Sequence, residues 1–384
     1  MSAALTLVAW LLAAAAIAGI VYQVAAAWQL ARFLRAPRQT PLYRPSVSVL
    51  KPLCGAEPHL ERNLRSFCDQ DYPDVQHLFG VADAGDPALA AVDAAVANLP
   101  GHRQVRVVDA TRHGCNLKIG NLLNMVDHAT GQILLIADSD VRVGAGYLDD
   151  VVAPFSDPEV GLVTCLYVGR PAPGLWSALG ALGINHGFLP SALVARALGR
   201  GDGCFGATMA VRRNLFDAIG GFGPLQDILA DDWALGAAVR RTGRRIALAA
   251  RPVDIIVHEP DLKSLLAHEI RWGRTIAAID RASYMASITT QPVALSALAL
   301  LAGGAAGPFL ALFAVATAVR LAVIRSQERT LGLAPAPLGR LALRELLTFC
   351  VFVVACCGRS VIWRGRRFSI RPDGTLEIKE GIPT

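Results

Sequence analysis

The sequence predicts an α/β protein in which a doubly wound parallel sheet lies between apolar helices that cross a membrane. Of the 384 residues, 53% are hydrophobic, which is too many for an ordinary soluble enzyme, and 18% are charged, which is enough for a sizeable water-facing domain. From residue 46 onward, short apolar runs alternate with helical segments, as in a parallel sheet with crossover helices. We therefore expect one soluble domain and several membrane segments in the same chain.

Residues 1–31 are expected to form a transmembrane helix. They contain no charged side chain and are long enough to cross a hydrocarbon core of about 30 Å. A signal peptide is the alternative, but it has a basic start and a shorter apolar stretch, whereas Arg32, Arg35 and Arg38 follow this run. Positive residues at that end place it in the cytoplasm. The prolines of residues 32–45 predict a stiff linker.

Residues 46–260 are expected to form the soluble α/β domain. No Gly-x-Gly-x-x-Gly turn follows its first strand, so a dinucleotide-binding domain loses its main support. We expect strands at residues 46–50, 75–82, 104–108, 160–167 and 203–211, and helices at residues 57–70, 88–98, 118–128, 175–198 and 231–241.

A further strand begins at Ile133 and leads directly into two carboxylates, Asp138 and Asp140. Its four apolar residues lack helical spacing, which is typical of a buried strand. Ligands of open parallel sheets bind beyond the carboxyl ends of the strands, and two carboxylates there can hold a hard divalent cation against a phosphate. Most Asp-x-Asp triplets are solvated turns, but the preceding strand favours a metal and diphosphate site.

The C-terminal third of the chain is expected to return to the membrane. Residues 261–285 have an apolar face with interleaved arginines, which predicts an amphipathic helix on the membrane surface. Residues 292–358 form the C-terminal membrane region. Its first apolar run is broken by two glycines and a proline, which leaves either two short spans or one kinked span. Residues 341–357 are a weaker candidate span, and residues 359–384 form a basic tail that the positive-inside rule places in the cytoplasm.

The net charge and the cysteine content indicate which kind of binding partner and which redox environment to expect. The net charge is +6, and much of the excess is arginine at the edges of apolar runs, without interleaved aromatic residues, so membrane phospholipid suits it better than nucleic acid. The eight cysteines include no Cys-x-x-Cys pair. Neither a zinc site nor a disulfide framework is indicated, and reduced thiols facing the cytosol are expected.

Seven short motifs resemble, in sequence order, those of ceramide glucosyltransferases. The resemblance to bacterial hopanoid-biosynthesis glycosyltransferases of the same superfamily is at least as close, and it covers roughly residues 46–274. The motifs are Val-Leu-Lys-Pro-Leu-Cys-Gly (49–55), Asp-Tyr-Pro (71–73), Ala-Asp-Ala-Gly-Asp-Pro (82–87), Asn-Leu-Lys-Ile-Gly-Asn-Leu (116–122), Ala-Asp-Ser-Asp (137–140), Ala-Asp-Asp-Trp (230–233) and His-Glu-Ile-Arg-Trp (268–272).

This resemblance implies a GT-A nucleotide-sugar-binding fold and a cytoplasm-facing site. The implied reaction is an inverting transfer of glucose or N-acetylglucosamine from a UDP-sugar to a lipid hydroxyl, such as that of ceramide or of a hopanoid polyol. The family pattern of three aspartates followed by Arg-Trp corresponds here to Asp86, Asp138, Asp232, Arg271 and Trp272.

Two positions depart from the family pattern, and two more match it less securely. His268 stands where the family usually has Gln or Arg. Asp140 stands where animal members have glycine, so a full Asp-x-Asp clasp is available here. His186 and Cys204 match family positions near the substrate, although a histidine in an apolar segment is more often a packed core residue.

The chemistry of these residue types is coherent with glycosyl transfer. Mg²⁺ or Mn²⁺ on Asp138 and Asp140 would act as a Lewis acid on a departing diphosphate. Lys118 and Arg271 would supply further positive charge there, although Lys118 also suits the start of a helix.

Carboxylates further along the chain suit the acceptor and the nucleoside. Asp232 would take the acceptor proton, since the neighbouring Asp231 tends to raise its pKa. The alternative is a purely structural role, in which both residues cap a helix. Asp83 or Asp86, after the second strand, would hold the uracil or the ribose.

Two rival functions remain open. A processive polysaccharide synthase is the nearest, but it would have Gln-x-x-Arg-Trp and more membrane spans. A membrane protein that binds or transports lipids would explain the apolar ends but would leave the carboxylates at strand ends without a role.

Overall fold

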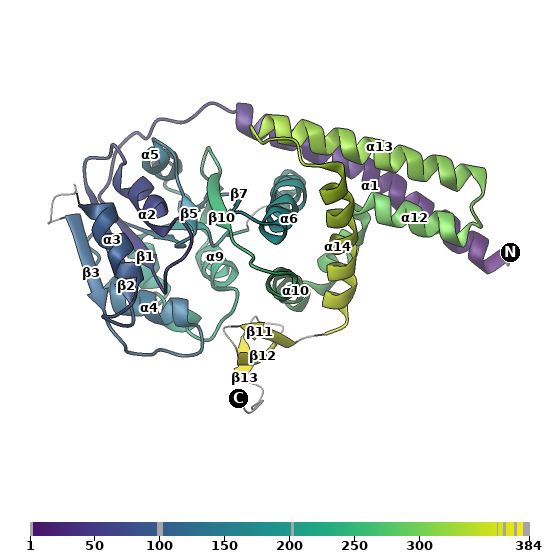
Figure 1. The fold of residues 1–384 in the computed structure, drawn as a ribbon. Helices are drawn as coiled ribbons and strands as arrows, with labels where there is room; N and C mark the ends of the chain where they lie inside the picture. Colours follow the sequence, from purple (N-terminus) through teal and green to yellow (C-terminus); the bar gives the residue numbers. More distant parts are fainter. Residues whose placement is uncertain are drawn as a thin grey trace.

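The protein consists of an α/β domain attached to a bundle of long apolar helices (Figure 1). The structure is a computed structural model that describes residues 3–97, 103–200, 203–358, 360–363, 366–371 and 375–378.

The α/β domain is built on a seven-stranded sheet with strand order β3-β2-β1-β4-β8-β6-β9. Strands β1 to β4 are parallel, as expected, but β8 is antiparallel to both of its neighbours, so the expectation of a wholly parallel sheet is wrong. The chain leaves the sheet at the end of β6 and re-enters it at the same edge, where Thr208 of β8 lies opposite Ala137 of β4. The strands are β1 (Val47–Pro52), β2 (Val75–Val81), β3 (Gln104–Val108), β4 (Ile133–Ala137), β6 (Val160–Thr164), β8 (Thr208–Arg212) and β9 (Arg245–Leu248).

A second, three-stranded sheet lies beside the first, with strand order β5 (Val141–Arg142), β10 (Val253–Val257) and β7 (Tyr167–Pro171). The single strand expected at residues 160–167 is therefore two strands, β6 and β7, in different sheets. The sequence does not reveal the break because the connecting residues, Cys165 and Leu166, are as apolar and as buried as the strands. The strand expected at residues 203–211 begins only at Thr208.

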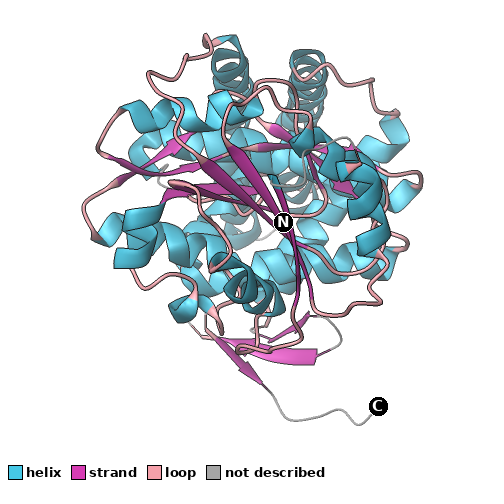
Figure 2. Ribbon diagram, turned by 90° about the vertical axis from the view of Figure 1, so that its left-hand side faces the viewer, coloured by secondary structure: helices cyan, strands magenta, loops and turns pink. Residues whose placement is uncertain are grey.

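Helices cover both faces of the large sheet (Figure 2). One face packs against α4 and α9 through residues such as Leu122 and Leu235, and the other packs against α2 and α5 through Phe67 and Val151. The helices of this domain are α2 (Leu60–Cys68), α3 (Ala88–Val96), α4 (Leu117–Val126), α5 (Tyr147–Val152), α8 (Arg213–Ala218) and α9 (Asp231–Arg241).

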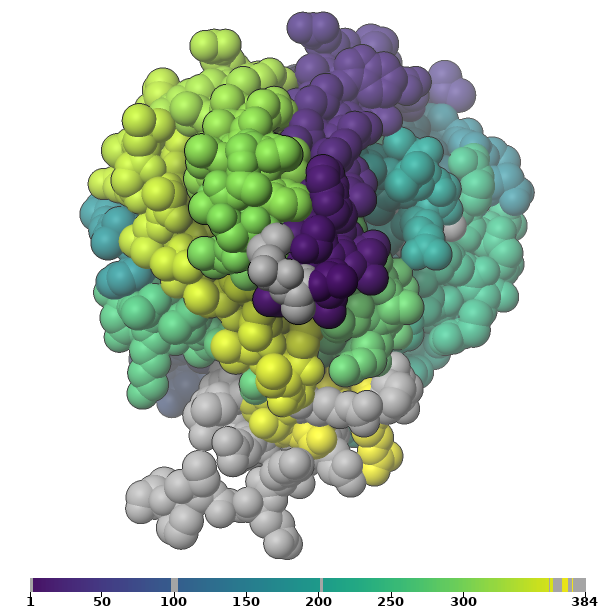
Figure 3. Space-filling view, turned by 90° about the vertical axis from the view of Figure 1, so that its right-hand side faces the viewer, coloured from purple at the N-terminus to yellow at the C-terminus, as the bar shows by residue number. Residues whose placement is uncertain are grey.

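The apolar helices α1 (Ala3–Arg35), α12 (Pro292–Ala302) and α13 (Gly307–Thr330) pack side by side (Figure 3). Among the described residues, α1, α13 and the helical segment Leu175–Arg200 are long and apolar enough to cross a membrane. This segment comprises α6 (Leu175–Gly183), η3 (Ile184–Phe188), α7 (Leu189–Ala195) and η4 (Arg196–Arg200). The expected N-terminal helix is confirmed, and the broken run after residue 292 is two separate helices.

The rest of the C-terminal part links the helix bundle to the α/β domain (Figure 1). It contains α10 (Leu262–Ile279), α11 (Arg281–Ala286) and α14 (Leu338–Cys356). A small antiparallel sheet of β11 (Ser360–Trp363), β12 (Arg366–Ile370) and β13 (Leu376–Ile378) lies within the expected basic tail. It packs on Leu229, close to the start of α9, through residues that include Phe368.

Candidate functional site

The carboxyl end of β4 and the start of α9 meet at a shared lysine. Lys118 of α4 places its Nζ 2.7 Å from Oδ1 of Asp138 and 3.3 Å from Oδ2 of Asp231. Burial opposes the charged form of Lys118, but these two carboxylates outweigh it and raise its pKa. The structure therefore brings together two of the aspartate motifs and the lysine that the sequence singled out.

The position of Lys118 follows from how α4 begins. The Asn116 side chain caps the helix by accepting hydrogen bonds from the backbone N–H groups of Lys118 and Ile119, at 3.1 and 3.2 Å. Asn116 is fully buried, and its own amide donates to the carbonyl of Ile228, just before α9. Lys118 thus lies in the first turn of the helix and also reaches the carboxylates.

Lys51 of β1 is a functional candidate that the sequence interpretation did not include. Its side chain is fully buried, its ammonium donates a hydrogen bond to the main-chain carbonyl of Asp138, and it lies 3.9 Å from the centre of the Phe67 ring. Burial lowers the pKa of Lys51 to about 8, although the carboxylates of Asp138 and Asp140 oppose this shift. A lysine inside an otherwise apolar strand was the available signal.

Asp140 has the features of a cation ligand. Its Oδ1 atom is buried and has no hydrogen-bond partner among the described residues. Burial, together with the nearby Asp138 carboxylate, raises the pKa of Asp140 to about 7. A buried carboxylate oxygen without a donor is costly, and a divalent cation would satisfy it.

The protein side chains alone do not complete a metal site. No group of three or more His, Cys, Asp or Glu side chains within the described ranges could hold a metal ion. Mg²⁺ is commonly bound by one or two carboxylates together with water and substrate phosphates. Asp138 and Asp140 fit that kind of site, because a bound diphosphate would provide the remaining oxygen ligands.

Asp232 has quite different surroundings from its neighbour Asp231. Its carboxylate oxygens accept hydrogen bonds from the backbone N–H groups of Gly206, at 3.0 Å, and Trp233, at 2.7 Å. Burial raises the pKa of Asp232 to about 6, and the charge of Asp231 adds to the effect. Asp231 is instead engaged by Lys118. Asp232 is therefore a carboxylate in a fixed position whose pKa lies near neutrality, as a general base requires.

Helix α10 contributes Arg271 and Trp272 to the same region. Arg271 is half-buried, its carbonyl accepts a hydrogen bond from the Thr275 hydroxyl at 2.7 Å, and its guanidinium makes no hydrogen bond or ion pair within the described part of the chain. Burial lowers the pKa of Arg271, and the opposing influences are, in order, those of Asp231, Glu259 and Asp232. The carboxylates whose charges act most on Arg271 thus include both aspartates at the start of α9.

His268 is oriented by a buried glutamate that the sequence interpretation missed. Its Nδ1 lies 2.8 Å from Oε1 of Glu259, and its ring meets the Trp272 ring edge-on at a centroid distance of 4.4 Å. Burial opposes ionisation of Glu259, but hydrogen bonds with His268 and Ser264 lower its pKa overall. No motif marked Glu259, because it lies in the loop between β10 and α10 and its role depends on a contact with α10 that folding creates.

Asp83 and Asp86 lie just beyond β2, as predicted, and both stabilise turns by accepting hydrogen bonds from backbone N–H groups. Asp86 Oδ1 accepts hydrogen bonds from the backbone N–H groups of Gly55, at 2.9 Å, and Ala88, at 2.8 Å. Asp83 Oδ1 accepts one from Gly85, at 2.8 Å. Within the described residues, their hydrogen bonds fix the loops at this edge of the sheet.

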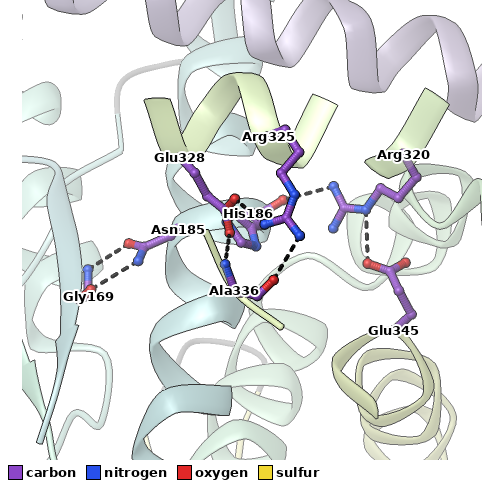
Figure 4. Close-up of polar contacts among 8 residues, drawn as sticks. All are labelled: Gly169, Asn185, His186, Arg320, Arg325, Glu328, Ala336 and Glu345. Carbon is purple, nitrogen blue, oxygen red and sulfur yellow. Dashed lines mark hydrogen bonds and ion pairs between the residues drawn. The ribbon is translucent and has the colours of Figure 1, made fainter. Parts of the chain in front are cut away.

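His186 and Cys204 are both buried. Cys204 is buried beneath α9, where a Cβ on Gly236 would lie 2.8 Å from its own Cβ. His186 is buried beside α13, with its Nε2 atom 3.8 Å from Oε1 of Glu328 (Figure 4). Arg320 of α13 donates a hydrogen bond to the His186 carbonyl. These contacts direct His186 toward the membrane helices.

The sequence of this chain is similar to those of known ceramide glucosyltransferases. Its sequence is 26% identical to ceramide glucosyltransferase 1 of Caenorhabditis elegans over 211 residues, which are 54% of this chain and 45% of the relative. It is 32% identical to ceramide glucosyltransferase of Komagataella phaffii over 107 residues, which are 27% of this chain and 21% of that protein. The chain thus spans less than half the length of these curated relatives.

A solved structure and a family model also match this chain. The fold is similar to that of a mannosyltransferase from Pyrobaculum calidifontis, solved in complex with GDP-Man and Mn²⁺, with a TM-score of 0.54 and 22% identity. This similarity covers 92% of this chain and 98% of that one, and it confirms the predicted GT-A fold. The model of glycosyl transferase family 21 matches residues 10–376, and the chain therefore belongs to this family of glycosyltransferases.

Proposed function

We propose that this protein is a membrane-anchored, inverting glycosyltransferase that moves glucose or N-acetylglucosamine from a UDP-sugar to a lipid hydroxyl. The observation that carries the proposal is the Lys118 bridge between Asp138 and Asp231. This bridge joins the carboxyl end of β4 to the start of α9, which also carries Asp232, whose pKa of about 6 suits a proton acceptor. The ceramide glucosyltransferase relatives support the lipid acceptor.

Asp232 performs the proton transfer. The backbone N–H groups of Gly206 and Trp233 hold its carboxylate in place before the acceptor arrives. As the lipid oxygen attacks the anomeric carbon on the face opposite the diphosphate, its proton passes to Asp232. The C–O bond to the diphosphate breaks in the same displacement, which inverts the configuration at that carbon.

The leaving diphosphate gains negative charge, and two cationic side chains of this protein can stabilise it. Lys118 is held by carboxylates at the edge of the sheet, and Arg271 approaches from α10. Charge-assisted hydrogen bonds from such groups are strongest in a site that excludes water. Asp138 and Asp140 would hold Mg²⁺ or Mn²⁺, which would add Lewis-acid stabilisation at the same oxygens.

The lipid acceptor and the membrane setting follow from the apolar helices. Three helices of the described residues are long and apolar enough to span a membrane. The arginines that follow α1 favour the cytoplasmic side for the catalytic domain, according to the positive-inside rule. A lipid hydroxyl at the membrane surface can then reach Asp232 without leaving the bilayer.

Sugar transfer by detergent-solubilised protein tests the proposal. UDP-glucose and UDP-N-acetylglucosamine would each be supplied with ceramide or with a hopanoid polyol, and the products would be separated by mass. We expect one donor and acceptor pair to give a glycolipid with inverted anomeric configuration. The absence of transfer with every pair would contradict the proposed donors and acceptors.

The Asp138 and Asp140 pair gives a separate test of the cation. We expect EDTA to abolish transfer and Mg²⁺ or Mn²⁺ to restore it. Asp140→Gly should raise the cation concentration needed for half-maximal activity without unfolding the domain, because it removes one of two proposed ligands. Activity that survives EDTA treatment would show that the cation is not required.

A further inference from the structure

A buried ion pair connects α14 to α10, the helix that carries Arg271 and Trp272. Arg344 of α14 donates to both carboxylate oxygens of Glu269, at 2.5 and 2.8 Å. The two side chains are only 5% and 15% exposed. Two parallel hydrogen bonds between a guanidinium and a carboxylate fix orientation as well as distance, because both groups are planar.

The surroundings of Arg344 leave the pair little freedom. Its Nη1 also donates to the carbonyl of Leu179, at 3.2 Å, and its Nε donates to the hydroxyl of Thr348, at 3.0 Å. A Cβ on Gly183 would lie 3.2 Å from Nη1 of Arg344, so the backbone of α6 closes over the ion pair. All three nitrogens of the guanidinium are therefore engaged in hydrogen bonds.

A second contact holds the next turn of α10. Arg274 donates to the carbonyl of Ser360, and a Cβ on Gly273 would lie 2.9 Å from the Cβ of Ala355 in α14. Residues of α10 on both sides of Arg271 and Trp272 are thus tied to the C-terminal part of the chain. These ties restrict rotation of α10 about its own axis.

The spacing along α10 relates these ties to the site. Successive residues of an α-helix are about 100° apart, so Glu269 and Gly273 share the face that meets α14. Arg271 then lies about 180° from the middle of that face, whereas Trp272, three residues after Glu269, lies at its flank. Asp231 and Asp232 are among the carboxylates whose charges act on the Arg271 guanidinium, and the rotation of α10 determines on which side of the helix this guanidinium lies.

We propose that Arg344 is a positioning residue which, through Glu269, sets the rotation of α10 that aims Arg271 at the acidic cluster. This inference rests on the proposed function, because it assigns to Arg271 the stabilisation of a leaving diphosphate. A helix of the C-terminal membrane region thereby determines the geometry of a site in the α/β domain.

The residue after Arg344 provides a matched control. Glu345 accepts a hydrogen bond from Nε of Arg320, at 2.9 Å, and so joins α14 to α13 (Figure 4). Arg320 also donates to Gln23 of α1, at 2.7 Å. This second pair is likewise mostly buried, at 11% and 23% exposed, but it contacts the membrane helices and not α10. Disrupting it affects the same helix without releasing Glu269.

The experiment compares Arg344→Lys, Glu269→Gln, the reversed pair Arg344→Glu with Glu269→Arg, and the control Glu345→Gln in the full-length protein. Misplacement of a positioned group by about 1 Å can cost on the order of 100-fold in rate. We expect each of the single variants at Arg344 and Glu269 to lower kcat by about 10-fold or more. The KM for the UDP-sugar should stay within about twofold, because the proposed interaction of Arg271 with the leaving diphosphate is made in the transition state. The reversed pair should recover part of kcat, and Glu345→Gln should keep most of it.

Hydrogen exchange of the α10 amides tests the same inference without activity. Exchange around Arg271 should be faster in Arg344→Lys than in wild type and unchanged in Glu345→Gln. The inference is overturned if Arg344→Lys and Glu269→Gln keep kcat and exchange at wild-type levels, or if Glu345→Gln changes both as much. A wild-type protein without sugar transfer would instead refute the proposed function, and hydrogen exchange would still decide the role of Arg344.

Discussion

At the scale of single residues, adjacent aspartates acquire different chemistry from their surroundings. Asp231 is engaged by the ammonium of Lys118, whereas Asp232 is held by two backbone N–H groups. Burial and the charge of Asp231 raise the pKa of Asp232 to about 6. The same type of side chain therefore serves as a structural counter-ion at one position and as a candidate base at the next.

Replacing Asp232 tests its role as the base. Loss of a positioned general base typically lowers the rate by about 10² to 10⁴-fold, whereas loss of a helix cap costs about 1 kcal/mol of stability. We expect Asp232→Asn to abolish most turnover while UDP-sugar binding and the melting temperature stay near those of wild type. Asp231→Asn should be milder, because Lys118 keeps its contact with Asp138. If Asp232→Asn retains more than about a tenth of wild-type turnover, the base lies elsewhere.

The pKa of Asp232 also predicts how activity depends on pH. The base is active when deprotonated, so kcat/KM should rise about tenfold per pH unit below a pH of about 6 and level off above it. The folded-state pKa lies above the unfolded value of about 3.9, so ionisation of Asp232 destabilises the fold as pH rises between these values. A rate profile at saturating Mg²⁺ checks this expectation. A flat profile between pH 5 and about 7 would contradict it.

At the scale of secondary structure, short polar contacts between elements set the geometry of the site. The hydroxyl of Ser48 in β1 accepts hydrogen bonds from the backbone N–H groups of Thr130, at 3.1 Å, and Gly131, at 2.8 Å. These residues lead into β4, which ends at Ala137, next to Asp138. β1 and β4 approach each other closely here. Because the two strands are parallel, their carboxyl ends also lie side by side, and Lys51 contacts Asp138 there.

Gly131 is the residue that permits this approach. A Cβ there would lie 2.4 Å from the backbone nitrogen of Ser48, so Gly131→Ala must displace a strand. We expect it to lower the free energy of unfolding by about 1–3 kcal/mol, as overpacking does. Gly144→Ala is the control, because a Cβ at Gly144 would meet nothing within 4 Å. Chemical denaturation of both variants should separate them, and equal stabilities would disprove the steric argument.

At the scale of the whole molecule, the helix bundle has two distinct ends, one next to the α/β domain and one far from it (Figure 1). Ala9 and Ala13, near the start of α1, pack with Phe309 at the start of α13. Leu30, near the end of α1, clusters with Leu331, just after α13. The two helices therefore run in the same direction, and the turn between α12 and α13 lies at the end of the bundle farthest from the α/β domain (Figure 1).

Labelling of introduced cysteines tests this topology. We expect Thr40→Cys, in the linker after α1, to react with a membrane-impermeant reagent only from the cytoplasmic side, because arginines flank it. The C-terminal tail should be on the same side. Ala306→Cys, in the turn before α13, should react only from the opposite side. Peptide mapping would separate these sites from the native cysteines, and labelling of both from one side would contradict the arrangement.

The sequence alone predicted features that depend on local composition and pattern. Residues 1–31 contain no charge, and a long apolar helix there is confirmed as α1. Alternating strands and helices, together with seven ordered motifs, led to the GT-A fold. The helix expected at residues 231–241 has those bounds in the structure, because its acidic start and basic end match the helix dipole.

Only the tertiary structure decided which distant residues meet. The antiparallel direction of β8 depends on where the chain returns after a long excursion, which no local pattern encodes. The Lys118 bridge and the buried ammonium of Lys51 join elements far apart in the chain, and the contact of Glu259 with His268 joins the loop after β10 to α10. Side-chain type and spacing determine what chemistry is available, whereas burial and proximity, which shift the pKa values and aim the charges, arise only from packing.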